Sequence, residues 1–276
     1  MPLGRLLVPP LVGTALLALA GCGSGPTYPK ATVASSLQTL FQEDHLSTTV
    51  RLIEHTLAVH LHYPGALTQS NGQIGIGPEF DEASRKLIMT IHRVILSTDA
   101  EVRFYVLLMS DPTVPGAYVT IVRYLDDVRR ANALMLDTPE VFARTVFEMN
   151  FLGPNAVTID QYVPRDIRLE EFLAWQLSRR LQHQLTEELQ SAGIATVGRC
   201  GGTFENGEFA FTLDVAPPPG TNLDEATMQK IFLTSTNLIA KVLSSYHFDR
   251  FQSIRLIHPP TGRHLLLPKT RLELFR

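Results

Sequence analysis

The sequence contains few of the residues that most often carry chemistry. Among its 276 residues there are two cysteines, Cys22 and Cys200, and one tryptophan. Two cysteines cannot form the framework of several disulfides that holds small secreted domains together. The motifs His-Glu-x-x-His, Gly-x-Ser-x-Gly and Cys-x-x-Cys are all absent. No catalytic or metal site is therefore predicted from one of these motifs.

Charge is evenly spread, and no long apolar run follows the first 21 residues. The 24 lysines and arginines nearly balance 27 acidic residues, which gives a formal net charge of −3. Without a basic block, binding to nucleic acid or to an acidic membrane surface is not predicted. No later segment has the about 20 apolar residues that a membrane-spanning helix needs. The remaining stretch of about 250 residues is enough for one large or two smaller domains.

The N-terminus does have an apolar run, over residues 6–20. It follows a single positive charge at Arg5, contains Pro9 and Pro10, and is too short to span a membrane comfortably. These features are typical of the apolar core of a secretory signal peptide. A plain signal peptide, cleaved after Ala20, is one interpretation of this segment.

The run ends in Leu19-Ala20-Gly21-Cys22, which resembles the lipobox of bacterial lipoproteins. The resemblance covers residues 1–22 alone, and no family is identified for the rest of the chain. It implies that residues 1–21 are removed and that the Cys22 thiol carries a diacylglyceryl group. Two or three acyl chains, such as palmitate, hold a protein stably on a membrane. Gly23 stands where an aspartate keeps some lipoproteins at the inner membrane, which favours the outer membrane of the cell envelope, facing the periplasm.

Residues 22–31 form the expected flexible tether, which at about 3.3 Å per residue reaches at most roughly 30 Å. The rest is expected to be an α+β fold of two similar two-layer modules bridged by a long helix. The first α+β module is expected over residues 32–124, a connector with helices and a strand over 125–168, and the long helix with the second α+β module over 169–276.

Apolar residues spaced by three and four predict helices, and alternating apolar residues predict strands. Helices are expected over residues 33–42, 80–97, 125–136, 138–149, 169–191 and 223–245. Strands are expected over residues 48–53, 56–63, 101–109, 117–124, 156–163, 194–200, 208–215, 253–257 and 264–267. A Gly-rich loop is expected over residues 66–78, and Asn206-Gly207 is a hairpin turn signal.

The two halves resemble each other at a spacing of about 145 to 150 residues. Residues 57–62 are followed by a Pro/Gly loop and by Phe80-Asp81-Glu82-Ala83, and residues 209–214 by a Pro/Gly loop and by Leu223-Asp224-Glu225-Ala226. Each half has the order helix, strand, strand, helix, strand, strand, which is ferredoxin-like by analogy. The alternative is that ordinary α+β patterning imitates a repeat.

The longest expected helix carries leucines at every fourth position from Leu169 to Leu189. Each step of four residues turns about 40° beyond a full turn of an α-helix, so the leucine stripe moves by roughly 200° around the axis. One flat partner cannot cover such a stripe. We therefore expect the two ends of this helix to pack against different parts of the protein, namely its two halves.

His60 and His62 are the best candidates for metal ligands. Alternate residues of a strand share a face, so both imidazoles can approach one ion. The sequence does not supply the third ligand, because Glu54 and His55 are neighbours only along the chain. The alternative is a polar patch on a solvated or interfacial sheet face, so no metal and no cofactor is assigned.

The remaining candidates are interpreted as structural. Cys200 is expected to be an incidental small residue in or beside a strand. The glycines of residues 72–77 lack the third glycine of a dinucleotide motif, because Phe80 occupies its position. The pairs Arg129-Arg130 and Arg179-Arg180 are expected on solvated helix faces rather than in phosphate sites.

These features predict a lipid-anchored envelope lipoprotein that is not an enzyme. Its expected role is binding or assembly with another envelope protein or with a second copy of itself, and the membrane is its second partner. Two alternatives stay open. One is a metal-binding protein or metal-dependent enzyme that uses His60 and His62, and the other is a periplasmic protein that carries a small ligand between its two modules.

Overall fold

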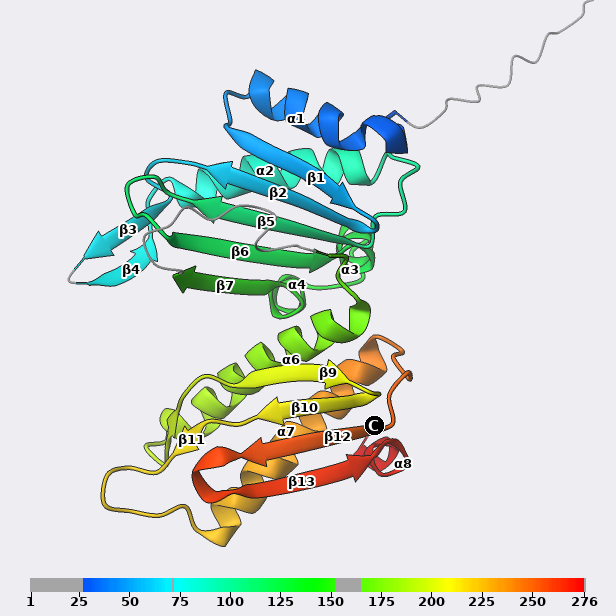
Figure 1. Ribbon diagram of the computed structural model, residues 1–276. Coiled ribbons are helices and arrows are strands. Elements are labelled where there is room, and N and C mark those ends of the chain that lie inside the picture. The colour runs from blue at the N-terminus through cyan, green and yellow to red at the C-terminus, as the bar shows by residue number, and fades with distance from the viewer. Residues whose placement is uncertain (1–26, 71, 152–164, 276) are drawn as a thin grey trace, which may run out of the picture.

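The structure, a computed structural model, describes residues 27–70, 72–151 and 165–275. It confirms the predicted α+β class: two sheets each carry helices on one face, and a long helix runs between them (Figure 1). Cys22, the rest of the lipobox and the strand expected at residues 156–163 lie outside the described residues. In the described ranges, no helix is both long enough and apolar enough to cross a membrane.

The first sheet has five strands in the order β1-β2-β5-β6-β7. Strands β2 and β5 are parallel, and the other neighbouring pairs are antiparallel. Helices α1 (Val33–Glu43) and α2 (Phe80–Ile95) pack on one face of this sheet. The strands are β1 (Thr48–Ile53), β2 (Thr56–His62), β5 (Phe104–Ser110), β6 (Ala117–Tyr124) and β7 (Val146–Phe151).

Alternation along β2 decides which side chains meet the helices. Leu57, Val59 and Leu61 lie in the core together with residues of α1 and α2. Ala58 belongs to a second apolar cluster on the opposite face of the sheet, and this cluster includes Phe172. The first sheet therefore buries apolar side chains on both faces.

The second sheet has four strands in the order β13-β12-β10-β9. Its central pair, β10 and β12, is parallel, and the outer pairs are antiparallel. Helices α6 (Leu169–Leu185) and α7 (Glu225–Ser245) pack on one face, and Asp224 caps α7 by accepting a hydrogen bond from the Thr227 N–H at 2.8 Å. The strands are β9 (Gly201–Glu205), β10 (Glu208–Thr212), β12 (Ser253–His258) and β13 (Arg263–Pro268).

Shorter elements complete the described chain. Two small antiparallel pairs are β3 (Leu67–Ser70) with β4 (Gln73–Ile76) and β8 (Thr196–Val197) with β11 (Val215–Ala216). The short helices are α3 (Leu125–Asn132), α4 (Thr138–Ala143) and α8 (Lys269–Leu272). Single turns are η1 (Lys30–Thr32), the π-helical η2 (Thr186–Gln190), η3 (Pro259–Thr261) and η4 (Glu273–Phe275).

The helix predicted over residues 138–149 is wrong in its second half. Helix α4 ends at Ala143, and Val146–Phe151 form β7, the edge strand next to β6. Along β7 buried and exposed residues alternate at its start, which is the period of a strand. The helix start signal at Thr138-Pro139 led to a helix prediction that continued over this strand. Pairing with β6 outweighs the local helix propensity of these residues.

The hairpin before β10 is correct in its turn and wrong in its first strand. Asn206 and Gly207 have φ of 49° and 80°, which is the left-handed backbone that a two-residue hairpin turn uses. The strand before the turn is β9 (Gly201–Glu205), whereas we expected residues 194–200. Two glycines at the start of β9 concealed it, because glycine is a poor strand former.

Gly202 of β9 is required by close packing. A Cβ atom at this position would lie 2.3 Å from the backbone oxygen of Ala174 in α6, so only glycine lets helix and strand approach this closely. A further difference concerns residues 66–78, expected as a loop, which contain the hairpin of β3 and β4. In β9 the glycine permits a close contact with α6, whereas the glycines of residues 66–78 indicated a loop where a hairpin lies.

The expectation for the leucine stripe holds only for its first residue. Leu169 packs against both the second core and the cluster on the first sheet. The later leucines lie in the second core alone: Leu173, Leu177, Leu181, Leu185 and Leu189. The wider π-helical turn η2 reverses part of the rotation, so Leu189 stays on this side. Contact with the first sheet comes mainly from Phe172, whose ring centroid is 5.3 Å from that of Phe104.

Candidate functional site

A buried polar network joins the two sheets. Asp127 of α3 and Arg144, which follows α4, form an ion pair at 2.7 Å, and the Arg144 side chain is 4% exposed. Tyr246, at the end of α7, donates a hydrogen bond from its hydroxyl to the other oxygen of the Asp127 carboxylate at 2.5 Å. The Arg144 guanidinium also lies 4.5 Å from the centroid of the Tyr246 ring, a cation–π contact. The network thus connects the last part of α7 to the first half of the chain.

Further hydrogen bonds fix Arg144 in place. Its Nε donates to Glu140 at 2.8 Å, and its Nη2 donates to the hydroxyl of Ser245 at 3.0 Å. Gln176 of α6 donates to the backbone oxygen of Arg144 at 2.8 Å. Three elements of the second half, α6, α7 and the turn after it, therefore meet at one arginine of the first half.

Burial and hydrogen bonding act in opposite directions on the carboxyl groups of this network. Burial raises the pKa of Asp127 above its usual value, although hydrogen bonds from Tyr246 and Arg144 act in the opposite direction. Burial would also raise the pKa of Glu140, but hydrogen bonds from Arg144 and Arg180 lower it below its usual value. Two carboxylates and two guanidinium groups therefore balance one another in charge.

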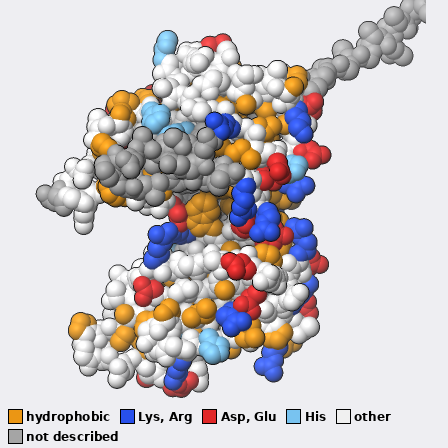
Figure 2. Space-filling view, viewed as in Figure 1, with side chains coloured by type: hydrophobic (Ala, Val, Ile, Leu, Met, Phe, Trp, Pro, Cys, Tyr) orange, Lys and Arg blue, Asp and Glu red, His pale blue; other side chains and the backbone are white. Residues whose placement is uncertain are grey.

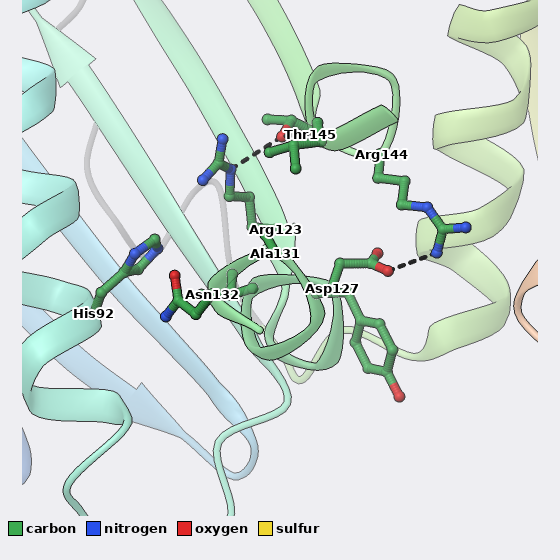
Figure 3. A pocket seen from close by; sticks show the side chains of 10 residues that line it. His92, Arg123, Asp127, Ala131, Asn132, Arg144 and Thr145 are labelled. Carbon is green, nitrogen blue, oxygen red and sulfur yellow. Dashed lines mark hydrogen bonds and ion pairs between the residues drawn. The ribbon is translucent and has the colours of Figure 1, made fainter. Parts of the chain in front are cut away.

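A pocket of 80 Å³ opens beside the network. In Figure 3 the Arg123 guanidinium of β6, the His92 ring of α2 and the Asn132 amide of α3 surround one space. Asp127 lines the same pocket, but its carboxylate turns toward Arg144 and is paired with it (Figure 3). Thr145 holds Arg123 by accepting a hydrogen bond from its Nε at 3.0 Å.

The groups in this pocket influence each other strongly. Burial, followed by the charge of Arg123, lowers the pKa of His92 to about 4, so this imidazole is neutral at pH 7. His92 Nε2 lies 3.0 Å from the hydroxyl of Tyr105. Burial raises the pKa of Tyr105 to about 12, so Tyr105 keeps its proton. The pocket therefore holds a neutral histidine next to a charged arginine.

The structure brings His60 and His62 together around a serine hydroxyl. Ser110 Oγ lies 2.9 Å from His60 Nε2 and 2.8 Å from His62 Nδ1, and the two ring centroids are 4.1 Å apart. Burial, followed by the charge of His62, lowers the pKa of His60 to about 4. Within the described ranges there is no group of three or more His, Cys, Asp or Glu that could hold a metal ion. The groups gathered here are thus two imidazole nitrogens, of His60 and His62, and the hydroxyl of Ser110.

The other singled-out residues have structural surroundings. Cys200 is 1% exposed and lies in the second core, and burial raises its thiol pKa to about 11, so it is a poor nucleophile. The arginine pair of α6 is not on a solvated face as expected. Arg179 forms an ion pair with Glu148 of β7, and Arg180 forms one with Glu140 at 3.3 Å. Both therefore strengthen the contact between the halves.

Basic side chains gather at the waist between the two sheets, as Figure 2 shows. A cavity of 480 Å³ there is lined by Arg103, Arg129, Arg168 and Arg250 together with Asp126, Asp166 and Glu170. Arg250 pairs with Glu170 at 3.1 Å, and Asp166 accepts a hydrogen bond from Thr56 at 2.7 Å. Charges of both signs line this cavity, which weakens its preference for an anion.

The edge strand β7 exposes apolar side chains. Phe147, Met149 and Phe151 are 43%, 37% and 58% exposed, and they alternate along the strand on the same face as α2. Among the described strands, β7 has β6 as its one neighbour in the sheet. A row of exposed apolar residues along a sheet edge is unusual, because such edges favour pairing with another chain.

Comparison with protein-family models, with curated proteins and with solved structures finds no match to this chain.

The polar network and the Arg123 pocket were not found from the sequence. Asp127, Arg144 and Tyr246 are far apart along the chain, and each has ordinary neighbours. One local signal was available. The helix start at Thr138 is well marked, and the polar residues Arg144 and Thr145 follow it at positions where a short helix could have ended. His60 and His62 could be paired because strand alternation is local.

Proposed function

We propose that this chain is a lipid-anchored lipoprotein of the bacterial cell envelope, that it acts by binding and not by catalysis, and that its partner docks along β7. The observation that carries the binding role is the exposed row of Phe147, Met149 and Phe151 on an edge strand. A strand of another chain that adds to this edge gains backbone hydrogen bonds and buries the apolar row. The partner is another envelope protein or a second copy of the chain.

The proposed lipid anchor at Cys22 limits how far the folded body lies from the membrane. Tyr28 donates a backbone hydrogen bond to Ser97 at 3.3 Å, and the Lys30 N–H donates to Asp99. The folded body therefore begins at Tyr28, and five residues, 23–27, lie between it and the lipidated Cys22. At about 3.3 Å per residue the six steps from Cys22 to Tyr28 span at most roughly 20 Å, which keeps the Tyr28 end of the body near the membrane surface.

We also propose that the two halves are copies of one ferredoxin-like module. Each half has a helix-strand-strand-helix-strand-strand order, and in each sheet the two central strands of these four are parallel. The strand β7 is an addition to the first copy, which is why the apolar edge occurs once. A fragment of residues 165–276 should then unfold in one cooperative transition, and a fragment with no such transition would contradict the proposal.

The anchor and the docking edge need separate experiments. For the anchor, cells are labelled with a fatty-acid analogue, and Cys22→Ala should lose the label that the wild type carries. For the edge, membranes are treated with a chemical crosslinker, and the yield of any crosslinked complex is compared among variants. Met149→Lys places a charge on the edge and should abolish the complex, whereas Met89→Lys changes a methionine of α2 that is 67% exposed and should not.

The mass of the crosslinked product identifies the occupant. A product of twice the chain's mass indicates self-association, and any other defined mass indicates a different envelope protein. Equal yields in Met149→Lys and Met89→Lys, or no product in the wild type, would contradict docking at β7. The result for Cys22→Ala is independent of both outcomes.

A second candidate function is metal binding at His60 and His62. The favouring observation is that both imidazoles contact the Ser110 hydroxyl, so they lie close enough to share one ion. Metal analysis of the purified protein tests it. Stoichiometric zinc that is lost in His60→Ala and His62→Ala would support this function, and a metal-free wild type in zinc-containing buffer would exclude it.

A further inference from the structure

Arg123 differs from the other arginines at the junction in its partners. Arg144, Arg179 and Arg180 each form an ion pair with a carboxylate. For Arg123, which is half-buried on β6, the described chain provides hydroxyl partners at Thr145 and Tyr105 and no carboxylate within ion-pair distance. A guanidinium that is partly removed from water is costly without a counter-charge.

The charge of the pocket around Arg123 is positive. Its lining holds two guanidinium groups, of Arg123 and Arg144, and one carboxylate, of Asp127. Because Asp127 is committed to Arg144 at 2.7 Å, the described lining of the pocket offers Arg123 no free carboxylate. An anion is therefore the complement that this pocket lacks.

Hydrogen-bond donors converge on the same space. Tyr105 keeps its proton and contacts His92 Nε2, and Arg123, which has no acceptor atom, hydrogen-bonds to Tyr105. With Arg123 donating to the Tyr105 oxygen, we assign the Tyr105 proton to the hydrogen bond with His92 Nε2, which leaves the single proton of the neutral ring on Nδ1. Asn132, which is exposed at the rim, adds an amide donor. The pocket thus combines a charged donor with two neutral ones.

Size limits the ligand. A volume of 80 Å³ is well below the about 300–1,000 Å³ of pockets that take drug-sized ligands, so it admits a small group and not a whole larger molecule. One planar guanidinium matches the two oxygens of a carboxylate, and a phosphate dianion would call for more cations than this pocket offers.

We propose that the pocket formed by His92, Arg123 and Asn132 binds the carboxylate group of a small monoanion. Arg123 supplies the charge and the N–H groups that Thr145 and Tyr105 leave free, and Thr145 holds it in position through Nε. The rest of the ligand extends past Asn132 to the solvent. This site is separate from the β7 edge, so it does not depend on the docking proposal.

Acetate is the probe that tests this site. The protein used is residues 22–276, the chain without its expected leader. Sodium acetate replaces sodium chloride stepwise at constant ionic strength. NMR follows the backbone amide and arginine side-chain signals. We expect saturable shifts at the Arg123 Nε–H and the Asn132 amide. Acetamide, which has the same shape without the charge, should cause no saturable shift.

Variants of the lining residues separate this site from general ionic effects. Arg123→Gln should weaken acetate binding at least about tenfold, because the charged donor is lost. Arg93→Gln is the matched control, since Arg93 is exposed on the same helix as His92 and does not line the pocket. Asn132→Asp, at an exposed position that tolerates the change, should also weaken binding by adding a negative charge at the rim.

Two outcomes would overturn the proposal. One is a wild type whose shifts stay linear in acetate, and the other is an Arg123→Gln protein that binds acetate as the wild type does. Should Arg123→Gln fail to fold, the Asn132→Asp protein decides: unchanged acetate affinity in that variant refutes the site.

Discussion

The buried pair of Asp127 and Arg144 leads to a quantitative prediction. Arg144→Met keeps much of the side-chain length and removes the cation that Asp127 faces at 2.7 Å. Asp127, itself 8% exposed, then stays buried with the Tyr246 hydroxyl as its remaining partner. Breaking a buried ion pair from one side costs about 3–5 kcal/mol, which is a large part of the about 5–15 kcal/mol that stabilises a typical domain.

Urea unfolding at pH 7 measures this loss. With a slope of about 2 kcal/mol per molar urea, a loss of about 4 kcal/mol lowers the unfolding midpoint by about 2 M. The double variant Asp127→Asn with Arg144→Met removes both charges, so it should be more stable than Arg144→Met alone.

The pH dependence of the loss identifies its cause. Burial raises the pKa of Asp127 above the unfolded value of 3.8, and removal of Arg144 raises it further. An acid with a raised folded-state pKa stabilises fully below its unfolded pKa, and this stability is lost as the pH rises through the folded pKa. The cost of Arg144→Met should therefore shrink as the pH falls from 7 toward 4. A cost under about 1 kcal/mol at pH 7, or one that does not change with pH, would refute the assignment of a buried charge to Asp127.

Three further predictions concern single sites. Cys200, with a pKa of about 11 and 1% exposure, should not react with a thiol reagent at pH 8 until urea unfolds the protein, and fast reaction of the native protein would contradict its burial. Gly202→Ala should lower the free energy of unfolding by about 1–3 kcal/mol because its Cβ meets backbone at 2.3 Å, whereas Gly201→Ala, with its nearest contact at 3.9 Å, should change it by under about 0.5 kcal/mol. In Arg123→Gln the pKa of His92 should rise above its value of about 4 in an NMR titration but stay below 6.5, because burial is the larger cause, and an unchanged pKa would mean that burial alone sets it.

Local patterns in the sequence predicted most of the regular structure. The helix expected at residues 80–97 is α2 (Phe80–Ile95), because its apolar stripe has the helical period throughout. The Asn206-Gly207 turn was identified because a left-handed pair of residues has a strong local signature.

The failures have a common physical cause, which is that tertiary contacts outweighed the local pattern. Residues 146–151 form a strand because β6 offers them an edge, and Gly202 lies in a strand because it pairs with β10, while the close approach of α6 requires a glycine there. The ion pair of Asp127 and Arg144 and the pocket of Arg123 depend on helices α2, α3, α4 and α7 meeting strand β6 at one place. No single stretch of sequence indicates that these elements lie together.

Docking along β7 is the central claim about function, and site-specific photocrosslinking tests it most directly. A photoreactive amino acid replaces Met149 on β7 in one protein and Met89 on α2 in another, and both are irradiated in intact cells. Because Met149 is 37% exposed and Met89 is 67% exposed, random collisions favour the α2 position. We expect one discrete crosslinked product from position 149 and none from position 89. No product from position 149, or the same product from both positions, would contradict the proposed docking edge.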